Sequence, residues 1–497
     1  MKHLLLFSLL LTIVLSASAQ VDKDAFEKQR QRMREQYERQ KNKAQRQYDD
    51  ARKKAESEYA AFRKRANEEY AAALQRGWDM MGVEPAVPKP NEPAPPRPQK
   101  VQIDKMPTSE PLPQGEVVLT PVKPAPVPLP PIPEPEPAAP TMQVAFYGTL
   151  CDMHADVDRL RFRLPSTDEK NIAEAWKRLS AEKYDGLLHD CMEQRETLHL
   201  SDWGYLQLLG RTSEQLLGKD SPEAVLLQMY LLTQSGYRVR IARCDGRLVL
   251  LVPFNRPIYN YSYINIDGIS HYVLSPEKSG SVYVCKVAFP REKVADIMMG
   301  QLPDLKGGTK TKRTLQGEKF GTMKATVEVD RRLIDYLDDY PLSSAWEYYS
   351  LAGFSDSTKA QLYPALRSQI DGKSKKKAAA MLLDFVQTAF DYATDQEQFG
   401  YERPLFADES LFYPKNDCED RSILFSILVR DLLGLDVVLV NWPGHLATAV
   451  AFPDAVEGDY YTVDGKRYVV CDPTYIGAPV GETMPQFKDV NAKLVKL

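Results

Sequence analysis

The chain has 497 residues, which is long enough for two or three domains with real cores. A formal net charge of -4 and a pI near 6.0 give no overall reason to expect a nucleic acid or an anionic membrane as a partner. The six cysteines are too sparse for a disulfide scaffold and contain no C-x-x-C pair, so we expect no metal site and no cofactor.

The N-terminus has the pattern of a secretory signal peptide. An apolar run from Leu4 to Leu15 follows a basic start, and Ala17-Ser18-Ala19 fits the small-residue pattern before a cleavage at Gln20. A transmembrane anchor is the weaker alternative, because the run is well short of the roughly 20 residues that span a bilayer. We therefore expect residues 1–19 to be removed and the mature protein to be exported, periplasmic or secreted, with no integral membrane span. One or two disulfides can form in such a compartment.

Residues 20–80 are predicted to form a long helix, because the segment is rich in Lys, Arg, Glu, Gln and Ala. Tyrosines recur every 11 residues at Tyr37, Tyr48, Tyr59 and Tyr70, and such a repeat matches a straight or slightly right-handed coiled coil. We expect self-association through residues 22–76. A single solvated helix held by charge pairs is the alternative, whereas interspersed acids disfavour a basic arm for nucleic acid.

Residues 81–143 form a proline-rich linker, with about 20 prolines between Glu84 and Pro140. Such a stretch cannot build a core and is expected to behave as a semi-rigid polyproline spacer. A ligand for a proline-binding domain is the less favoured alternative.

The remaining chain mixes helical and strand patterns, which predicts an α+β fold with helices packed on antiparallel strands. We divide it into an accessory or degenerate α+β domain over 144–310 and a catalytic domain over 311–497. The predicted helices are Pro222–Gln234, Val329–Leu337, Lys375–Tyr392 and Asp420–Leu433. The predicted strands are Tyr237–Ala242, Leu248–Val252, Val282–Phe289, Thr322–Val329, Asp436–Val440, Ala447–Phe452 and Arg467–Cys471.

The stretch Asp417-Cys418-Glu419-Asp420 opens an apolar-periodic segment that ends near Gly434. A cysteine in the first turn of a helix meets unpaired N–H groups and the positive end of the helix dipole, and both favour the thiolate. Cys418 is therefore the candidate nucleophile, because its acidic neighbours argue against a buried small hydrophobic residue. Glu419 and Asp420 are interpreted as first-turn acids, with cation binding as the alternative.

Two later strand ends carry the other groups that a cysteine nucleophile needs. Gly444-His445-Leu446-Ala447 begins one strand, and Val470-Cys471-Asp472-Pro473 ends another. If these ends converge, His445 is the base and Asp472 fixes its tautomer and stabilises the imidazolium. The plainer alternatives are a structural histidine and a turn-forming aspartate.

These motifs resemble the transglutaminase-like superfamily, which has a papain-like cysteine fold, and are closest to the bacterial transglutaminase-like cysteine proteinases. The resemblance covers about 110 residues from Met381 to Val490, and it implies the triad Cys418, His445 and Asp472. The donor for the oxyanion stays open among the Cys418 N–H, Trp442 and Tyr413. The resemblance is carried by Asp395-Gln396-Glu397-Gln398-Phe399-Gly400, Glu409-Ser410-Leu411, Asp417-Cys418-Glu419-Asp420, Gly444-His445-Leu446-Ala447 and Cys471-Asp472-Pro473-Thr474.

The preceding domain has a segment of similar rhythm in which the catalytic positions are replaced. The alignment places Ser221 at the position of Cys418, Arg247 at that of His445 and Ser275 at that of Asp472. We interpret it as a degenerate repeat, with a coincidence of two helix-strand-strand units as the alternative.

The favoured function is an exported cysteine hydrolase that cleaves peptide or amide bonds of a protein or peptide substrate through a thioester. Acyl transfer to an amine, as in a protein-crosslinking transglutaminase, is the alternative enzyme. A non-catalytic binding or scaffold protein of the cell envelope is the alternative of another class.

Overall fold

The computed structural model describes residues 23–90, 97–103, 108–119, 141–181, 184–274, 281–305 and 307–497. They form two compact units that divide between Lys64 and Arg65. The predicted signal peptide over 1–19 and the proline run over 120–140 lie outside the described residues. None of the described helices combines the length and the apolar character that a bilayer crossing requires.

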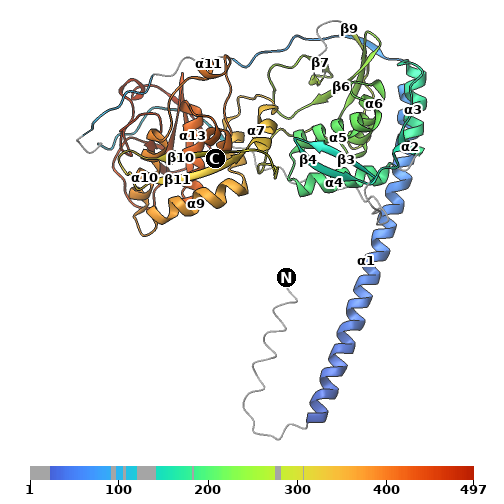
Figure 1. Cartoon of the computed structure of the whole chain (residues 1–497), viewed down its shortest axis with the longest axis horizontal. Coiled ribbons are helices and arrows are strands. Elements are labelled where there is room, and N and C mark those ends of the chain that lie inside the picture. The colour runs from blue at the N-terminus through green and yellow to red at the C-terminus, as the bar shows by residue number, and fades with distance from the viewer. Residues whose placement is uncertain are drawn as a thin grey trace. The chain divides into compact units, whose positions relative to one another are not determined.

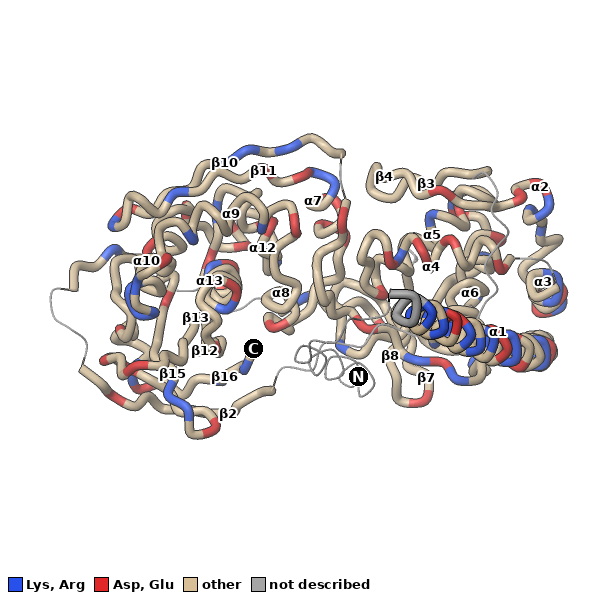
Figure 2. The backbone as a smooth tube through the Cα atoms, turned by 90° about the horizontal axis from the view of Figure 1, so that it is seen from below, with Lys and Arg blue, Asp and Glu red and all other residues tan. Residues whose placement is uncertain are grey.

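A single helix, α1 (Lys23–Leu74), forms the predicted helical segment. Basic and acidic residues alternate along it, and pairs such as Arg52–Glu56 one turn apart support it (Figure 2). In the first unit Tyr37 and Tyr48 are each 63% exposed, and Tyr59 contacts Phe62 of the same helix with ring centroids 6.2 Å apart. The coiled coil therefore stays a prediction.

The last turns of α1, from Arg65 on, belong to the second unit, so only the earlier part of the helix forms the first unit. Tyr70 is buried against Trp176 and Phe289, with ring centroids 4.8 and 5.5 Å apart. The Asn67 side chain exchanges hydrogen bonds with Gln234 and accepts one from the Trp176 indole N–H. The same repeat that is exposed in the first unit is thus used as core in the second.

The C-terminal part of the second unit holds a six-stranded sheet in the order β14-β15-β13-β12-β16-β2. All neighbours are antiparallel except β16 and β2. Helix α13 (Cys418–Leu433) packs against β12 and β13 and also contacts α8, α10 and α12. Helices α13 and α10 are labelled in Figure 1, and the other elements in Figure 2. The strands are β2 (Gln114–Leu119), β12 (Val437–Trp442), β13 (His445–Val450), β14 (Tyr460–Val463), β15 (Lys466–Cys471) and β16 (Ala492–Lys496).

A hairpin and a set of helices complete this part. The hairpin strands are β10 (Lys310–Gln316) and β11 (Lys324–Asp330). The helices are α7 (Arg331–Asp338), α8 (Trp346–Ala352), α9 (Asp356–Ile370), α10 (Lys375–Thr388), α11 (Asp395–Gln398), α12 (Ala407–Phe412) and the short η1 (Pro485–Phe487).

The preceding part holds a second six-stranded sheet, in the order β1-β9-β5-β6-β8-β7. Helix α6 (Pro222–Gln234) packs on β5 and β6 as α13 packs on β12 and β13. The strands are β1 (Asp79–Gly82), β5 (Arg240–Cys244), β6 (Arg247–Pro253), β7 (Tyr263–Ile266), β8 (Ile269–Val273) and β9 (Ser281–Cys285), and a separate hairpin joins β3 (Met142–Phe146) to β4 (Thr149–Met153). The remaining helices are α2 (Val157–Leu160), α3 (Glu169–Ala181), α4 (Asp185–Thr197) and α5 (Asp202–Leu217).

The described parts of the proline-rich segment differ from the expected free spacer. The backbone of Glu84 bonds to Tyr263, Val101 N–H bonds to the Ile476 carbonyl at 3.0 Å, and β2 joins the C-terminal sheet. The reason is that Gln114–Leu119 contains no proline and can pair along its backbone, while the stretches before it attach through isolated contacts.

The α+β class predicted from the sequence is confirmed. Helix α6 has the predicted bounds, and α13 begins two residues before the predicted Asp420. Strands β7, β14 and β16 are only four or five residues long and were not predicted, because so short a run carries little periodicity.

Candidate active site

Cys418 is the first residue of α13, and Asp417 is its N-cap. The Asp417 N–H donates to the Asp420 carboxylate at 3.4 Å, which holds the turn that begins the helix. Only 5% of Cys418 is exposed, so its thiol is enclosed by protein.

His445 and Asp472 meet through a hydrogen bond of 2.8 Å between Nε2 and Oδ2. His445 opens β13 and Asp472 follows the end of β15, and these strands are neighbours in the sheet. The other oxygen of Asp472 accepts the N–H groups of Thr474 and Tyr475 at 2.8 and 3.1 Å. Three donors therefore fix the carboxylate, and the carboxylate fixes the imidazole.

Two aromatic rings hold the plane of the His445 imidazole. Trp442 lies parallel to it within 5°, with centroids 5.9 Å apart, and Phe487 lies within 10° at 5.2 Å. Trp442 is directly opposite His445 in the β12–β13 pair. The sequence pattern indicated Trp442 only as an oxyanion donor. It gave no sign of Phe487, which is 42 positions from His445 in the chain and lies in no predicted helix or strand.

The Cys418 thiol lies at the start of β13, where the N–H of Leu446, the residue after His445, bonds to the sulfur. Among the described residues the second ring nitrogen of His445, Nδ1, is buried and has no partner. The structure thus joins His445 to Asp472 directly and connects Cys418 to this strand end through Leu446.

The electrostatic environment of Cys418 differs from the expected one, which was predicted to favour the thiolate. Burial, followed by the Glu419 and Asp417 carboxylates, raises the pKa of the thiol well above its usual value. The sulfur lies 3.2 Å from Glu419 Oε2 and donates to it. The dipole of α13 favours the thiolate, but enclosure and two adjacent acids outweigh it in this conformation.

A buried acidic cluster flanks the thiol, and we define it as Asp395, Asp417 and Glu419. One oxygen from each lies within 4.8 Å of the others. One oxygen of Asp417 and one of Glu419 are buried without a partner. Burial and the neighbouring Asp420 and Glu419 raise the pKa of Asp395 to about 10. An all-oxygen set of this kind suits a hard cation such as Ca²⁺ or Mg²⁺.

The three candidate donors for the oxyanion, Tyr413, Trp442 and the Cys418 N–H, have different surroundings. The Tyr413 hydroxyl donates to Asp338 at 2.9 Å and lies beside Arg403, so it serves a separate ion-pair network. Trp442 is stacked on His445. The indole N–H of Trp442 is buried without a hydrogen-bond partner among the described residues, so this N–H and the Cys418 N–H at the helix start both remain candidates.

In the preceding part the expected match of Ser221 with Cys418 shifts by one residue. Ser221 is the N-cap of α6 and its hydroxyl accepts the Ala224 N–H at 3.1 Å, so by helix position it corresponds to Asp417. Pro222 then occupies the place of Cys418, and Glu223 that of Glu419. Arg247 opens β6 opposite Cys244 as His445 opens β13 opposite Trp442. Ser275 lies outside the described residues.

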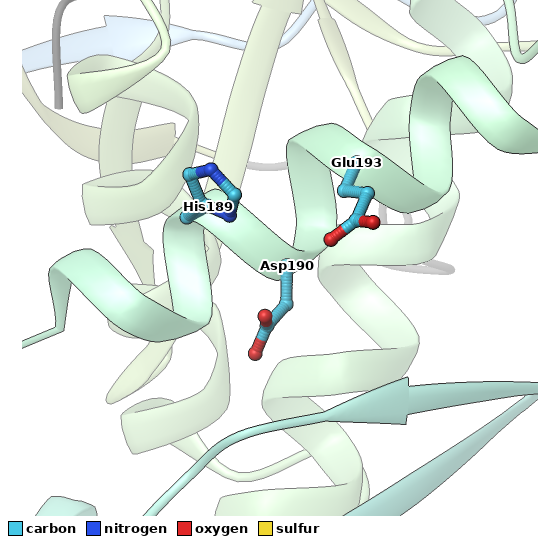
Figure 3. Close-up of side chains that lie close together, drawn as sticks. All are labelled: His189, Asp190 and Glu193. Atoms are coloured by element: carbon cyan, nitrogen blue, oxygen red, sulfur yellow. The ribbon is translucent and has the colours of Figure 1, made fainter. Parts of the chain in front are cut away.

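A second group of metal-ligating types lies on α4, where His189, Asp190 and Glu193 have ligand atoms within 4.8 Å (Figure 3). Asp190 is 2% exposed and accepts the His154 N–H at 2.5 Å and the His154 ring at 3.0 Å. Those bonds tie α4 to the end of β4, which gives the carboxylate a structural role.

All six cysteines are buried and free, including Cys471, whose core position was expected. Comparison of the chain with known protein families, with curated proteins and with solved structures finds no match.

Proposed function

We propose that the protein is an exported cysteine hydrolase of the transglutaminase-like kind, which cleaves peptide or amide bonds. The observation that supports this most is the 2.8 Å bond between His445 and Asp472, at a strand start where the N–H of the next residue, Leu446, bonds to the Cys418 sulfur. The second imidazole nitrogen is buried and has no partner among the described residues, at a cost of about 1–3 kcal/mol. His271 also leaves one buried nitrogen unpaired, but its other nitrogen meets a backbone carbonyl and not a carboxylate.

The roles follow from the donors and acceptors. His445 takes the thiol proton on Nδ1, and Asp472 stabilises the resulting imidazolium through Nε2–H. The thiolate attacks the carbonyl carbon, and the Cys418 N–H faces the oxygen that becomes negative. His445 then gives its proton to the leaving amine, and a thioester forms. Water, deprotonated by the same imidazole, releases the acid and restores the thiol.

The rings of Trp442 and Phe487 have a positioning role in this scheme. An imidazole that must accept and return a proton has to keep its plane between thiol and leaving group. Two rings parallel to it within 10° allow movement in that plane and oppose tilting. The enclosed, protonated thiol belongs to a resting state, and opening the site is a step that precedes catalysis.

The test uses the full mature chain near neutral pH and an electrophile that alkylates thiolates, with the adducts mapped by mass spectrometry. Because the thiol is enclosed in the resting state, we expect Cys418 to react slowly, and His445→Ala to slow that reaction further, by about 100-fold. A His271→Ala variant is the matched control, because His271 is also a buried histidine but lies in β8. Equal labelling of Cys418 in wild type and His445→Ala would refute the triad.

Hydrolysis and acyl transfer share the thioester and differ in what resolves it. Incubating the acylated protein with and without a primary amine and following release of the acyl group separates the two. We expect release in water alone. Release of the acyl group only in the presence of the amine would instead indicate a crosslinking transglutaminase.

A further inference from the structure

The part of the chain that precedes the proposed triad contains a cavity of about 470 Å³. It is lined mainly by α5, α6 and β6, which are labelled in Figure 1. The volume falls within the roughly 300–1,000 Å³ of ordinary small-molecule sites, which combine apolar walls with a few polar groups. The walls of this cavity have both features, since Leu206, Val225 and Leu250 are apolar and Gln207 and Gln228 are polar.

The cavity lies at the place that corresponds to the proposed triad. Ser221, the N-cap of α6, lines it and corresponds by helix position to Asp417. Leu248, the second residue of β6, also lines it and corresponds to Leu446, whose N–H bonds to the Cys418 sulfur. The helix start and the strand start that meet at the thiol in one part therefore border a cavity in the other.

Three charged side chains on the cavity wall have no ion-pair partner among the described residues. Arg211 and Glu214 lie on α5 about one turn apart and are both half-buried, yet they do not pair with each other. Asp220, which directly precedes the N-cap of α6, is the third. The Arg211 guanidinium lies over the Tyr147 ring, 4.4 Å from its centroid, and interacts with the Tyr147 hydroxyl. The fourth charged lining residue, Asp339, accepts that hydroxyl at 2.8 Å.

A buried donor without an acceptor belongs to the same wall. Trp203 lines the cavity and is 4% exposed, and its indole N–H has no hydrogen-bond partner among the described residues. Its ring packs against Tyr261, another lining residue, with centroids 6.2 Å apart. A buried N–H without a partner is unfavourable, and a carbonyl oxygen of a ligand would satisfy it.

We propose that this cavity binds a short peptide of two or three residues that carries a free ammonium and a free carboxylate. The Arg211 guanidinium takes the carboxylate, because its fork of N–H donors matches that group. Glu214 and Asp220 take the ammonium. A ligand with a single charge would leave the opposite charge on the wall unpaired, whereas a zwitterion pairs both signs. Trp203 needs a neutral carbonyl, which a peptide bond supplies and a free amino acid lacks.

The experiment is a calorimetric titration of the full mature chain, carrying Cys418→Ala, with the peptide Ala-Leu-Ala. The Cys418→Ala background keeps the peptide intact whatever the C-terminal part does to it. N-acetylated and C-amidated forms of the same peptide each lack one terminal charge. We expect each form to bind about tenfold more weakly than Ala-Leu-Ala, because a hydrogen bond to a charged group is lost and its partner on the wall stays unpaired.

Variants of the wall assign each charge. Arg211→Gln should weaken Ala-Leu-Ala about tenfold and leave the C-amidated peptide unchanged, since the bond it removes is already absent there. Glu214→Gln combined with Asp220→Asn should spare the N-acetylated peptide in the same way. Retained binding of the modified peptide shows that each variant is folded. Glu174→Gln on α3 is the matched control, because its carboxylate is exposed and pairs with Lys177, and it should bind Ala-Leu-Ala as the parent does.

The proposal is overturned if Ala-Leu-Ala shows no saturable binding, or if the wall variants weaken all three peptides equally or none of them. Free leucine that binds as tightly as Ala-Leu-Ala would overturn the assignment to a peptide. The proposal does not require a reactive Cys418, so it and the proposed function can fail separately.

Discussion

The two six-stranded sheets have the same strand order but differ at the positions of the proposed triad. Each places its packed helix on the two central strands, α6 on β5 and β6 and α13 on β12 and β13. The register also agrees, since Leu251 pairs with Val273 as Ala449 pairs with Val470. Counting from these pairs puts Leu274 at the place of Cys471.

The two helix starts have similar geometry but carry different residues at the position of the proposed nucleophile. Glu223 is 4% exposed and accepts the Leu164 N–H at 2.9 Å, while Glu419, its counterpart, is 5% exposed and accepts the Cys418 thiol. Pro222 at the nucleophile position removes the thiol and also the backbone N–H that would face an oxyanion. Proline is favoured at the first helical position, so the replacement keeps the helix start.

The largest difference in activity should appear when the first residue of α13, Cys418, or of α6, Pro222, is replaced by alanine. Cys418→Ala should lower kcat/KM by about 10⁴-fold or more, because the covalent route is lost. Pro222→Ala should leave kcat/KM unchanged, since no reacting group stands there. Comparable losses in both variants would mean that the two parts act as one site.

Asp472→Asn should lower kcat/KM by about 10³-fold with little change in the fold, because an amide cannot stabilise the imidazolium and can impose the wrong tautomer. Arg247→Ala in the other copy is the control and should be neutral. Full activity of Asp472→Asn would show that His445 is oriented by Trp442 and Phe487 alone.

Trp442 pairs with the first residue of β13 and Cys244 with the first residue of β6, and replacing these two residues should affect stability differently. Trp442→Ala removes a buried indole and should lower the free energy of unfolding by about 3–5 kcal/mol. Cys244→Ala removes one buried sulfur and should cost about 1 kcal/mol. Urea unfolding followed by circular dichroism measures both, and equal losses would contradict the assigned packing of the histidine plane.

The pH dependence of stability should come from the acids around Cys418. Glu402 has a folded-state pKa of about 7, above its ordinary 4.5, by burial first and then by Glu419. The folded state therefore binds more protons between these values, and stability present below pH 4.5 is lost as the pH rises through 7. Thermal midpoints from pH 4 to 8 should fall, and Glu402→Gln should flatten the fall. A midpoint that rises over this range would contradict the sign.

The smallest expected effect is that of a hard cation on the acidic cluster. Calcium should neutralise the unpartnered oxygens of Asp417 and Glu419 and raise the thermal midpoint by about 2–4 °C. Asp395→Asn should abolish the shift. His189→Ala, in the other cluster, should preserve it, and a shift that survives Asp395→Asn would place the cation elsewhere.

Local patterns were enough to predict some of these features. The long helix, α6 and the triad residues follow from composition, period and motif, because each is encoded by neighbouring residues. The strand β16 and the role of Phe487 could not be predicted, since both depend on pairing or stacking with residues tens of positions away. The proline-rich segment was expected to be free because its composition builds no core, and composition alone does not report that Lys89 has a buried partner.

The sequence by itself singled out the residues of the proposed triad, since Cys418, His445 and Asp472 are recognisable from their immediate neighbours. Only the tertiary structure decided their state. It enclosed the thiol beside Asp417 and Glu419, which reverses the effect expected from the helix dipole on the thiol pKa. Desolvation depends on everything packed around an atom, and no local pattern in the chain contains that information.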